Sequence, residues 1–180
     1  MKALFTVTAS HDVFAPATLM RASSICTACI GIVKSLVLKT ALEMSIPFVA
    51  FGWSPGQAPI QSAIMKTNGA LIRQNQRALT SNLSDGLKTT NTPYLIPDVY
   101  YEQYADRFPY NIHPLAFFDY DEAKIGDELK GIGWEVPTNT DTNSTNCLLN
   151  AFANHVHLER HRFHPYVWEI ANMVRQGVMS

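Results

Sequence analysis

The feature that most constrains the fold is a long apolar helical pattern that leads, within a few residues, into a compact apolar strand. From Cys26 to Met44 the apolar residues recur at helical spacing, and the charged residues fall between them. The segment Pro47–Phe51 is a short apolar run closed by Gly52, which is typical of a buried strand. A helix joined to a strand by a short connection is half of a βαβ unit. The sequence therefore predicts an α/β fold, rich in helices, with a small parallel sheet.

The remaining segments are predicted to be mostly helical. Two further strands are expected at Ala3–Ala9 and Pro114–Phe118, and helices are expected within Ile60–Leu87, Asp121–Ile132, Thr145–Arg160 and Pro165–Gln176. Gly69 is a candidate break in the first helical segment, and Asp119 or Asp121 is the expected N-cap of the second. The segment Thr89–Tyr110 contains three prolines and is expected to be a loop with one short helix.

Composition and charge exclude several classes of protein. With 47% hydrophobic and 16% charged residues, the 180-residue chain is expected to form one folded domain rather than a disordered chain. The net charge of −1 provides no global basic field for binding DNA. The longest apolar stretch, Ile25–Leu42, is interrupted by polar residues, and Met1–Ser10 does not fit a targeting signal. We therefore expect a cytoplasmic protein with no membrane segment.

The three cysteines are the strongest chemical signal in the sequence. Cys26 and Cys29 lie three residues apart at the start of the predicted helix, where backbone N–H groups and the helix dipole favour a thiolate. Cys147 follows the good capping residues Asn143–Thr145 and therefore also lies near a predicted helix start. Each thiol is thus placed where an anionic ligand is favoured.

Four interpretations of these cysteines are open. They can be ordinary core or surface thiols, since cysteine is often buried. A thioredoxin-like redox pair fits poorly, because that motif follows a different pattern of strands and leaves Cys147 unexplained. Structural zinc needs four ligands, so a histidine would have to complete the set. An iron–sulfur cluster held by three thiolates, with one iron left open, accounts for the number of cysteines directly, and we favour it.

A second group of candidate ligands consists of four histidines within ten residues, namely His155, His157, His161 and His164. His157 and His161 are spaced i, i+4 and would share one helix face, but Glu159 is not where a zincin motif requires its glutamate. The group is therefore either a solvated helix face or, with Arg160 and Arg162 interleaved, a small patch that faces phosphate or RNA.

Two parts of the chain resemble a known family. The sequence Ile25-Cys-Thr-Ala-Cys29, followed by a helix and by Pro47-Phe-Val-Ala-Phe-Gly-Trp-Ser-Pro-Gly-Gln57, resembles the middle of PP-loop ATP pyrophosphatases. This superfamily includes tRNA thiolation enzymes and N-acetyl sugar amidotransferases. The segments Gly133–Asn150 and His164–Gly177 look like the C-terminal part of uncharacterised members. The resemblance covers most of the chain from about residue 24.

The resemblance implies a partial adenine-nucleotide alpha-hydrolase-like fold. Residues 1–132 would form an incomplete nucleotide-binding sheet with its helices, and residues 133–180 would form a C-terminal helical region. ATP would be bordered by the loop at the carboxyl end of the predicted strand, which is where open α/β sheets bind ligands. The loop residues concerned are Gly52, Trp53, Ser54, Gly56 and Gln57. Cys26, Cys29 and Cys147 match, in order, the thiolates that hold a [4Fe–4S] cluster in the thiolation branch, with zinc as the alternative cofactor.

The departures from the family are equally informative. The Ser-Gly-Gly-x-Asp-Ser loop that cradles the ATP pyrophosphate is not in this sequence, and the loop after the strand differs from the usual Gly-His-Asn. The chain alone is therefore not expected to adenylate a substrate, and no catalytic residue is assigned. A homodimer, or a partner chain that supplies the missing N-terminal half, would complete an ATP-dependent transferase or ligase acting on tRNA or on a small-molecule acceptor. The alternative is a noncatalytic metal-binding or RNA-binding module that uses the cysteines and the His/Arg face.

Overall fold

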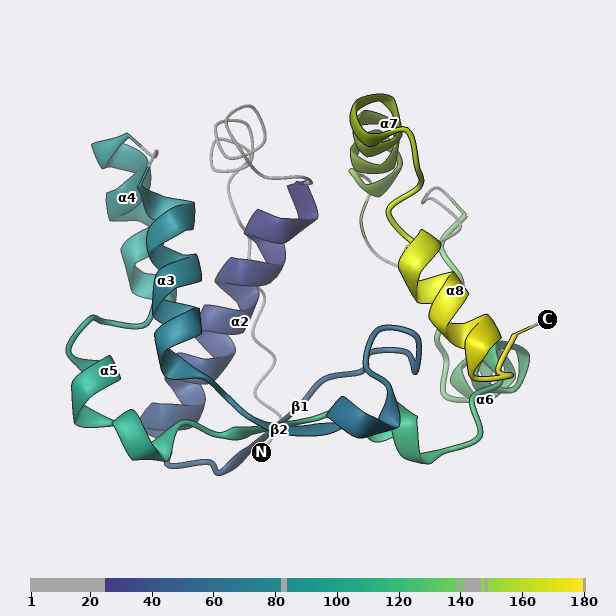
Figure 1. The fold of residues 1–180 in the computed structure, drawn as a ribbon, viewed down its shortest axis with the longest axis horizontal. Coiled ribbons are helices and arrows are strands. Elements are labelled where there is room, and N and C mark those ends of the chain that lie inside the picture. The colour runs from purple at the N-terminus through teal and green to yellow at the C-terminus, as the bar shows by residue number, and fades with distance from the viewer. Residues whose placement is uncertain (1–24, 82–83, 139, 141–146, 148, 180) are drawn as a thin grey trace. The chain divides into compact units, whose positions relative to one another are not determined.

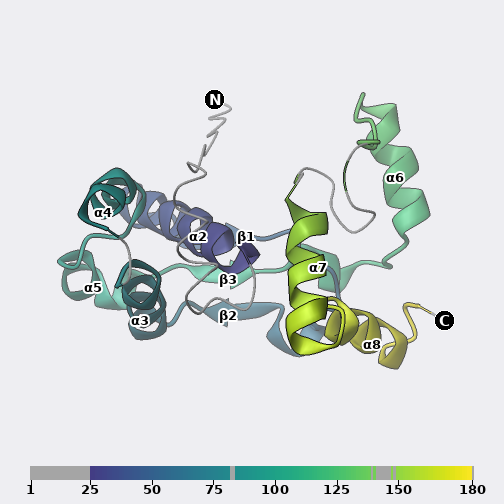
Figure 2. The same cartoon turned by 90° about the horizontal axis from the view of Figure 1, so that it is seen from above.

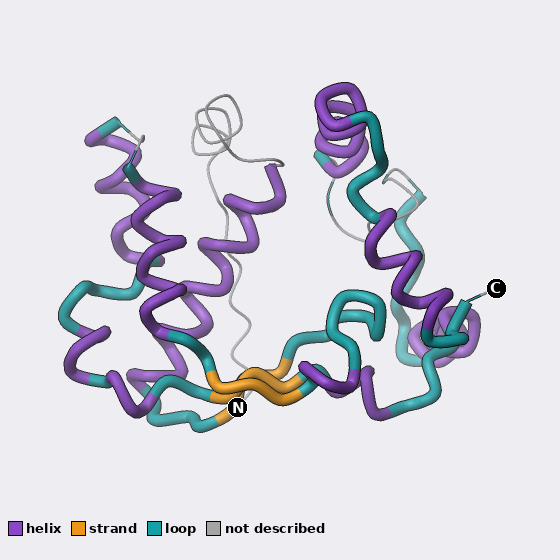
Figure 3. Tube along the Cα trace, in the orientation of Figure 1, coloured by secondary structure: helices purple, strands orange, loops and turns teal. Residues whose placement is uncertain are grey.

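The described part of the chain is helix-rich and contains a three-stranded sheet (Figures 1 and 3). The computed structural model describes residues 25–81, 84–138, 140, 147 and 149–179, with side chains from Cys29 onward. The described α-helices are α2 (Ile25–Glu43), α3 (Gly69–Thr80), α4 (Asp85–Asn91), α5 (Tyr100–Gln103), α6 (Glu122–Gly131), α7 (Asn150–His161) and α8 (Val167–Arg175). Single 3-10 turns are η1 (Ile60–Ser62), η2 (Thr92–Tyr94), η3 (Ala105–Arg107) and η4 (Pro114–Phe117). The strand predicted at Ala3–Ala9 lies outside the described residues.

The sheet is mixed rather than parallel. Its strands are β1 (Phe48–Ala50), β2 (Ile64–Lys66) and β3 (Tyr110–Ile112), in the order β1-β3-β2. Tyr110 N donates to Pro47 O at 2.8 Å and Phe51 N donates to Ile112 O at 2.9 Å, which is a parallel register. Between β3 and β2, Thr67 N pairs with Pro109 O and His113 N with Ala63 O, which is an antiparallel register. The prediction of a parallel sheet therefore holds only for β1 and β3.

One strand prediction and one helix prediction need correction. The segment Pro114–Phe118 is not a strand, because residues 114–117 form the 3-10 turn η4 and the strand lies just before it, at Tyr110–Ile112. Proline has no N–H to donate to a ladder, so Pro114 suits the start of a turn better than a strand. The strand β2 was predicted as helix, and its three residues are all exposed, so no alternation marks it in the sequence.

Helix α2 confirms the apolar helical pattern. It spans Ile25–Glu43 and is followed by Ser45, whose φ of +55° ends the helix in a left-handed conformation. Leu38 and Leu42 on this helix are buried. Gly31 lies so close to α3 that an added Cβ would sit 2.5 Å from Leu79 Cδ1. Helices α2 and α3 therefore lie side by side, as both views show (Figures 1 and 2).

The chain divides into two compact units. One comprises the chain up to Val49 together with Lys66–Tyr110, and the other comprises Ala50–Met65 with Asn111–Ser180. The first unit contains α2 to α5 around buried Leu38, Ile96 and Phe108, and the second contains α6 to α8. Among the described residues, no helix is both long enough and apolar enough to cross a lipid bilayer.

The N-cap of α6 distinguishes the two aspartates that the sequence left as alternatives. Asp121 Oδ1 accepts hydrogen bonds from Ala123 N at 3.0 Å and Lys124 N at 3.1 Å, so Asp121 is the cap. We expect Asp121→Ala to lower the free energy of unfolding by about 1 kcal/mol, because two helix N–H groups lose their acceptor. Asp119→Ala is the matched control and should change it by less than about 0.5 kcal/mol. Urea unfolding followed by tryptophan fluorescence measures both, and equal effects would contradict this assignment.

Candidate functional site

The loop after β1, Gly52–Gln57, is an ordered turn. Gln57 N donates to Ser54 O at 3.0 Å, and Ser54 N donates to the side-chain oxygen of Gln57 at 3.2 Å. Ser54, Pro55 and Gly56 are buried, whereas Gly52 and Gln57 are exposed and Trp53 is half-buried. Of the residues expected to border a nucleotide, Gly52, Trp53 and Gln57 are thus the ones that a ligand could reach.

Helix α8 holds this loop in place. Asn172 Nδ2 donates to Gly56 O and Gln176 Nε2 donates to Pro55 O, both at 3.0 Å. Ser54 Oγ donates to a carboxylate oxygen of Glu169 at 2.5 Å. These contacts were not predicted from the sequence. The spacing of Glu169, Asn172 and Gln176 places them along one face of a helix, which is the signal that could have indicated a polar contact.

Aromatic rings lie beside the loop within the same unit. The Trp53 ring stacks on the His113 imidazole, with centroids 5.1 Å apart and planes 14° apart. Phe51 lies 5.7 Å from Trp53 and 5.8 Å from His113. His113 is buried, so this cluster fixes the ring of Trp53 at the edge of the loop.

Cys26 and Cys29 lie near the start of α2, as predicted, whereas Cys147 lies before α7 and in the other unit. Cys29 is half-buried near the beginning of α2 in the first unit, and the side chain of Cys26 lies outside the described residues. Cys147 is half-buried in the second unit, where its carbonyl oxygen accepts a hydrogen bond from Asn150 N at 3.2 Å. The sequence predicted that this helix begins at about Thr145, but α7 begins at Asn150, so Cys147 precedes the helix.

The donor set suits a thiolate-bound metal or cluster, because cysteine sulfur is the ligand that both iron–sulfur clusters and structural zinc use. Among the described residues, no group of three His, Cys, Asp or Glu side chains gathers around one point. The assignment of Cys26, Cys29 and Cys147 as one ligand set therefore stays a prediction.

Two of the C-terminal histidines, His157 and His161, pack on each other. The rings of His157 and His161 lie 4.5 Å apart on α7, which agrees with their i, i+4 spacing, and Phe163 packs edge-on against His157 at 5.2 Å. Arg162 has a φ of +63° and ends the helix, and its guanidinium lies 3.5 Å from the Glu159 carboxylate. The carboxylate of Glu159 therefore partly neutralises the positive charge that Arg162 contributes to this surface.

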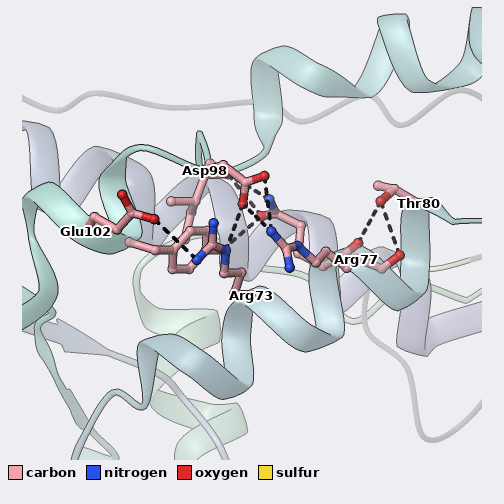
Figure 4. Close-up of polar contacts among 8 residues, drawn as sticks. Arg73, Arg77, Thr80, Asp98 and Glu102 are labelled. Atoms are coloured by element: carbon pink, nitrogen blue, oxygen red, sulfur yellow. Dashed lines mark hydrogen bonds and ion pairs between the residues drawn. The ribbon is translucent and has the colours of Figure 1, made fainter.

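A cluster of charged residues that the sequence did not indicate lies in the first unit. Arg73 Nε donates to Asp98 at 2.8 Å, and Arg77 Nη2 reaches the two oxygens of the same carboxylate at 3.3 and 3.4 Å. Glu102 lies 3.8 Å from Arg73 Nη1 (Figure 4). The Arg73 guanidinium also lies over the Tyr101 ring, 5.4 Å from its centroid. The two arginines line a cavity of about 480 Å³ between α3 and α5.

Asp98 lies between the guanidinium groups of Arg73 and Arg77, and this position affects the pKa of its carboxyl group. The hydrogen bond from Arg73, followed by the positive charges of Arg73 and Arg77, holds the pKa of the Asp98 carboxyl below its usual value. Because the folded-state pKa of Asp98 is lowered, its ionised carboxylate stabilises the folded protein at pH values above the ordinary pKa of aspartate. This contribution to the free energy of unfolding is lost as the pH falls through the folded-state pKa.

An NMR titration of the Asp98 carboxyl is therefore expected to give a midpoint below about 3.9, the value for an unperturbed aspartate. Arg73→Gln should raise this midpoint more than Arg77→Gln does, since the hydrogen bond from Arg73 is the largest cause of the shift. A midpoint that responds equally to both variants, or to neither, would show that the geometry of Figure 4 does not govern this group.

Comparison with known proteins adds no relative: no family model, no curated protein and no solved structure matches this chain.

Proposed function

We propose that this chain is part of a PP-loop-type ATP-dependent enzyme for sulfur or amide transfer and is incomplete on its own. The observation that carries the proposal is the placement of Cys29 near the N-terminus of α2 and of Cys147 directly before α7. Both thiols are half-buried, so each is reachable by a metal ion or a cluster. With Cys26 they would hold a [4Fe–4S] cluster, which when bound supplies an open iron that accepts sulfide.

The loop Gly52–Gln57 supports a ligand site at the end of β1. It follows the carboxyl end of a strand that pairs in parallel with β3, and such strand ends are where open α/β sheets bind ligands. Trp53, fixed by its stack on His113, offers a flat ring at the exposed side of this loop. We propose that this ring and the exposed Gln57 border the adenine nucleotide.

The proposal requires a second chain, either another copy or a partner that supplies the missing half. Among the described strands, β1 lies at an edge of the sheet, and an edge strand can pair with another chain. Large apolar residues also remain exposed in this part of the chain, namely Ile30 and Val33 on α2, Met44 just after α2, and Phe48 on β1. Exposed apolar patches of this kind mark protein–protein contacts.

The experiment that tests the proposal is anaerobic reconstitution with iron and sulfide, followed by visible absorption and counting of bound iron. A brown protein with about four irons per chain is expected. A colourless protein with one zinc per chain would replace the cluster with a structural metal and would favour a noncatalytic module.

The noncatalytic alternative also has an observation in its favour. His157 and His161 lie together on α7, Arg160 on the same helix is exposed, and this surface could contact RNA phosphates. RNA binding that is unchanged by removal of any cysteine, in a protein that binds no cluster, would favour this alternative.

A further inference from the structure

The cavity between α3 and α5 has a composition that points to a ligand. One wall is a single stripe of α3, formed by Ala70, Arg73, Gln74 and Arg77 at positions i, i+3, i+4 and i+7. The opposite wall is formed by Tyr101, Ala105 and Phe108, and Gly69 completes the lining. The volume of about 480 Å³ lies within the range of about 300–1,000 Å³ that is usual for small-molecule sites.

Small residues keep this cavity open. Ala70 and Ala105 face it from the two walls. At Gly69, an added Cβ would sit 2.9 Å from the Phe108 ring, so a side chain there would collide with the opposite wall. Phe108 and Tyr101 in that wall are buried and stack on each other, with ring centroids 5.7 Å apart. The cavity therefore lies within a well-packed region, and all of its lining residues belong to the first unit.

The charges of the lining are of one sign. Arg73 and Arg77 both line the cavity, and no Asp or Glu is among its lining residues. Asp98 and Glu102 contact the guanidinium groups (Figure 4). Neither acid is among the residues that line the cavity. Their contacts involve Nε and Nη1 of Arg73 and Nη2 of Arg77, whereas each guanidinium carries five N–H donors. The acids thus orient the two guanidinium groups and leave donors for a ligand.

We propose that the α3–α5 cavity binds a small organic molecule through its phosphate or carboxylate group. An oxyanion is the ligand class that two arginines and the Gln74 amide can satisfy together, because guanidinium donors match the spacing of oxygens in carboxylate and phosphate. Inorganic phosphate alone would fill only part of the cavity, so the ligand carries an organic portion against Tyr101 and Ala105. This site is separate from the loop Gly52–Gln57, which belongs to the other unit, and does not depend on the PP-loop proposal.

Titration calorimetry of the full chain tests the proposal, with sodium phosphate and sodium succinate as probes at constant ionic strength. Saturable binding of at least one probe is expected in the millimolar range, and the tighter probe identifies the ligand as a phosphate ester or a carboxylic acid. Arg73→Gln and Arg77→Gln should each weaken binding at least about tenfold, the loss of a charge-assisted hydrogen bond. Ala105→Leu should weaken it as well, because it fills the cavity without changing any charge.

Arg107→Gln is the matched control. Arg107 lies on η3 in the same unit, but its guanidinium bonds to Ser45 Oγ at 2.6 Å and it does not line the cavity. Its removal should leave the affinity unchanged. The proposal is overturned if neither probe binds saturably up to tens of millimolar, if Arg107→Gln weakens binding as much as Arg73→Gln, or if Ala105→Leu has no effect.

Discussion

Replacing Cys147 with serine is expected to lower the iron bound after anaerobic reconstitution from about four atoms per chain to less than one. A [4Fe–4S] cluster that is held by only three protein thiolates cannot lose one of them without losing most of its attachment. Serine keeps the size of the side chain but removes the soft sulfur ligand. Because Cys147 is half-buried and precedes α7, this change should not unfold the protein. Iron counting and visible absorption measure the loss.

Two further variants separate a cluster from the competing interpretations. Cys29→Ser should abolish the absorption as Cys147→Ser does, although the two cysteines lie 118 residues apart (147 − 29 = 118) and in different units. His157→Gln should leave a cluster intact, whereas a structural zinc completed by this histidine would be lost. Iron content that survives Cys147→Ser would show that this residue is not a ligand and would remove the main support for the proposed function.

The main elements could be predicted because their signals are local. The pattern from Cys26 to Met44 repeats over five turns, and the observed helix Ile25–Glu43 agrees with it within a residue at each end. The strand β2 could not be found in this way, since it has three residues and is recognised only by its pairing with β3. Short strands depend on tertiary hydrogen bonds more than on their own sequence.

In the candidate sites, too, the features with a local sequence signal could be predicted, whereas contacts between distant residues could not. The sequence predicted Cys29 near the start of a helix, because capping and periodicity are read within a few residues. The same signals placed Cys147 within a helix from about Thr145, whereas it precedes α7. It did not show that Ser54 would bond to Glu169, 115 residues away, or that Arg73 would share Asp98 with Arg77. Such contacts arise only when helices dock, so the α3–α5 cavity and the role of α8 become visible in the structure alone.

The contact between the loop and α8 leads to the second large expected effect. Gly56 lies against the backbone of α8, where an added Cβ would sit 2.5 Å from Glu169 O and 2.6 Å from Met173 Cγ. The methionine side chain can move, but the carbonyl oxygen can move only with the helix. Gly56→Ala is therefore expected to separate the loop from α8 and to break the hydrogen bonds from Asn172 and Gln176. The combined overpacking and lost hydrogen bonds should lower the free energy of unfolding by about 3 kcal/mol.

The matched control is Gly52→Ala in the same loop, where an added Cβ meets nothing within 4 Å. It should change the free energy of unfolding by less than about 0.5 kcal/mol. Urea unfolding followed by tryptophan fluorescence is the suitable measurement, since Trp53, Trp134 and Trp168 all lie in the second unit with the loop and α8. Equal stabilities of the two variants would mean that α8 does not clamp the loop. The ring of Trp53 would then lack the fixed position on which its proposed contact with the nucleotide depends.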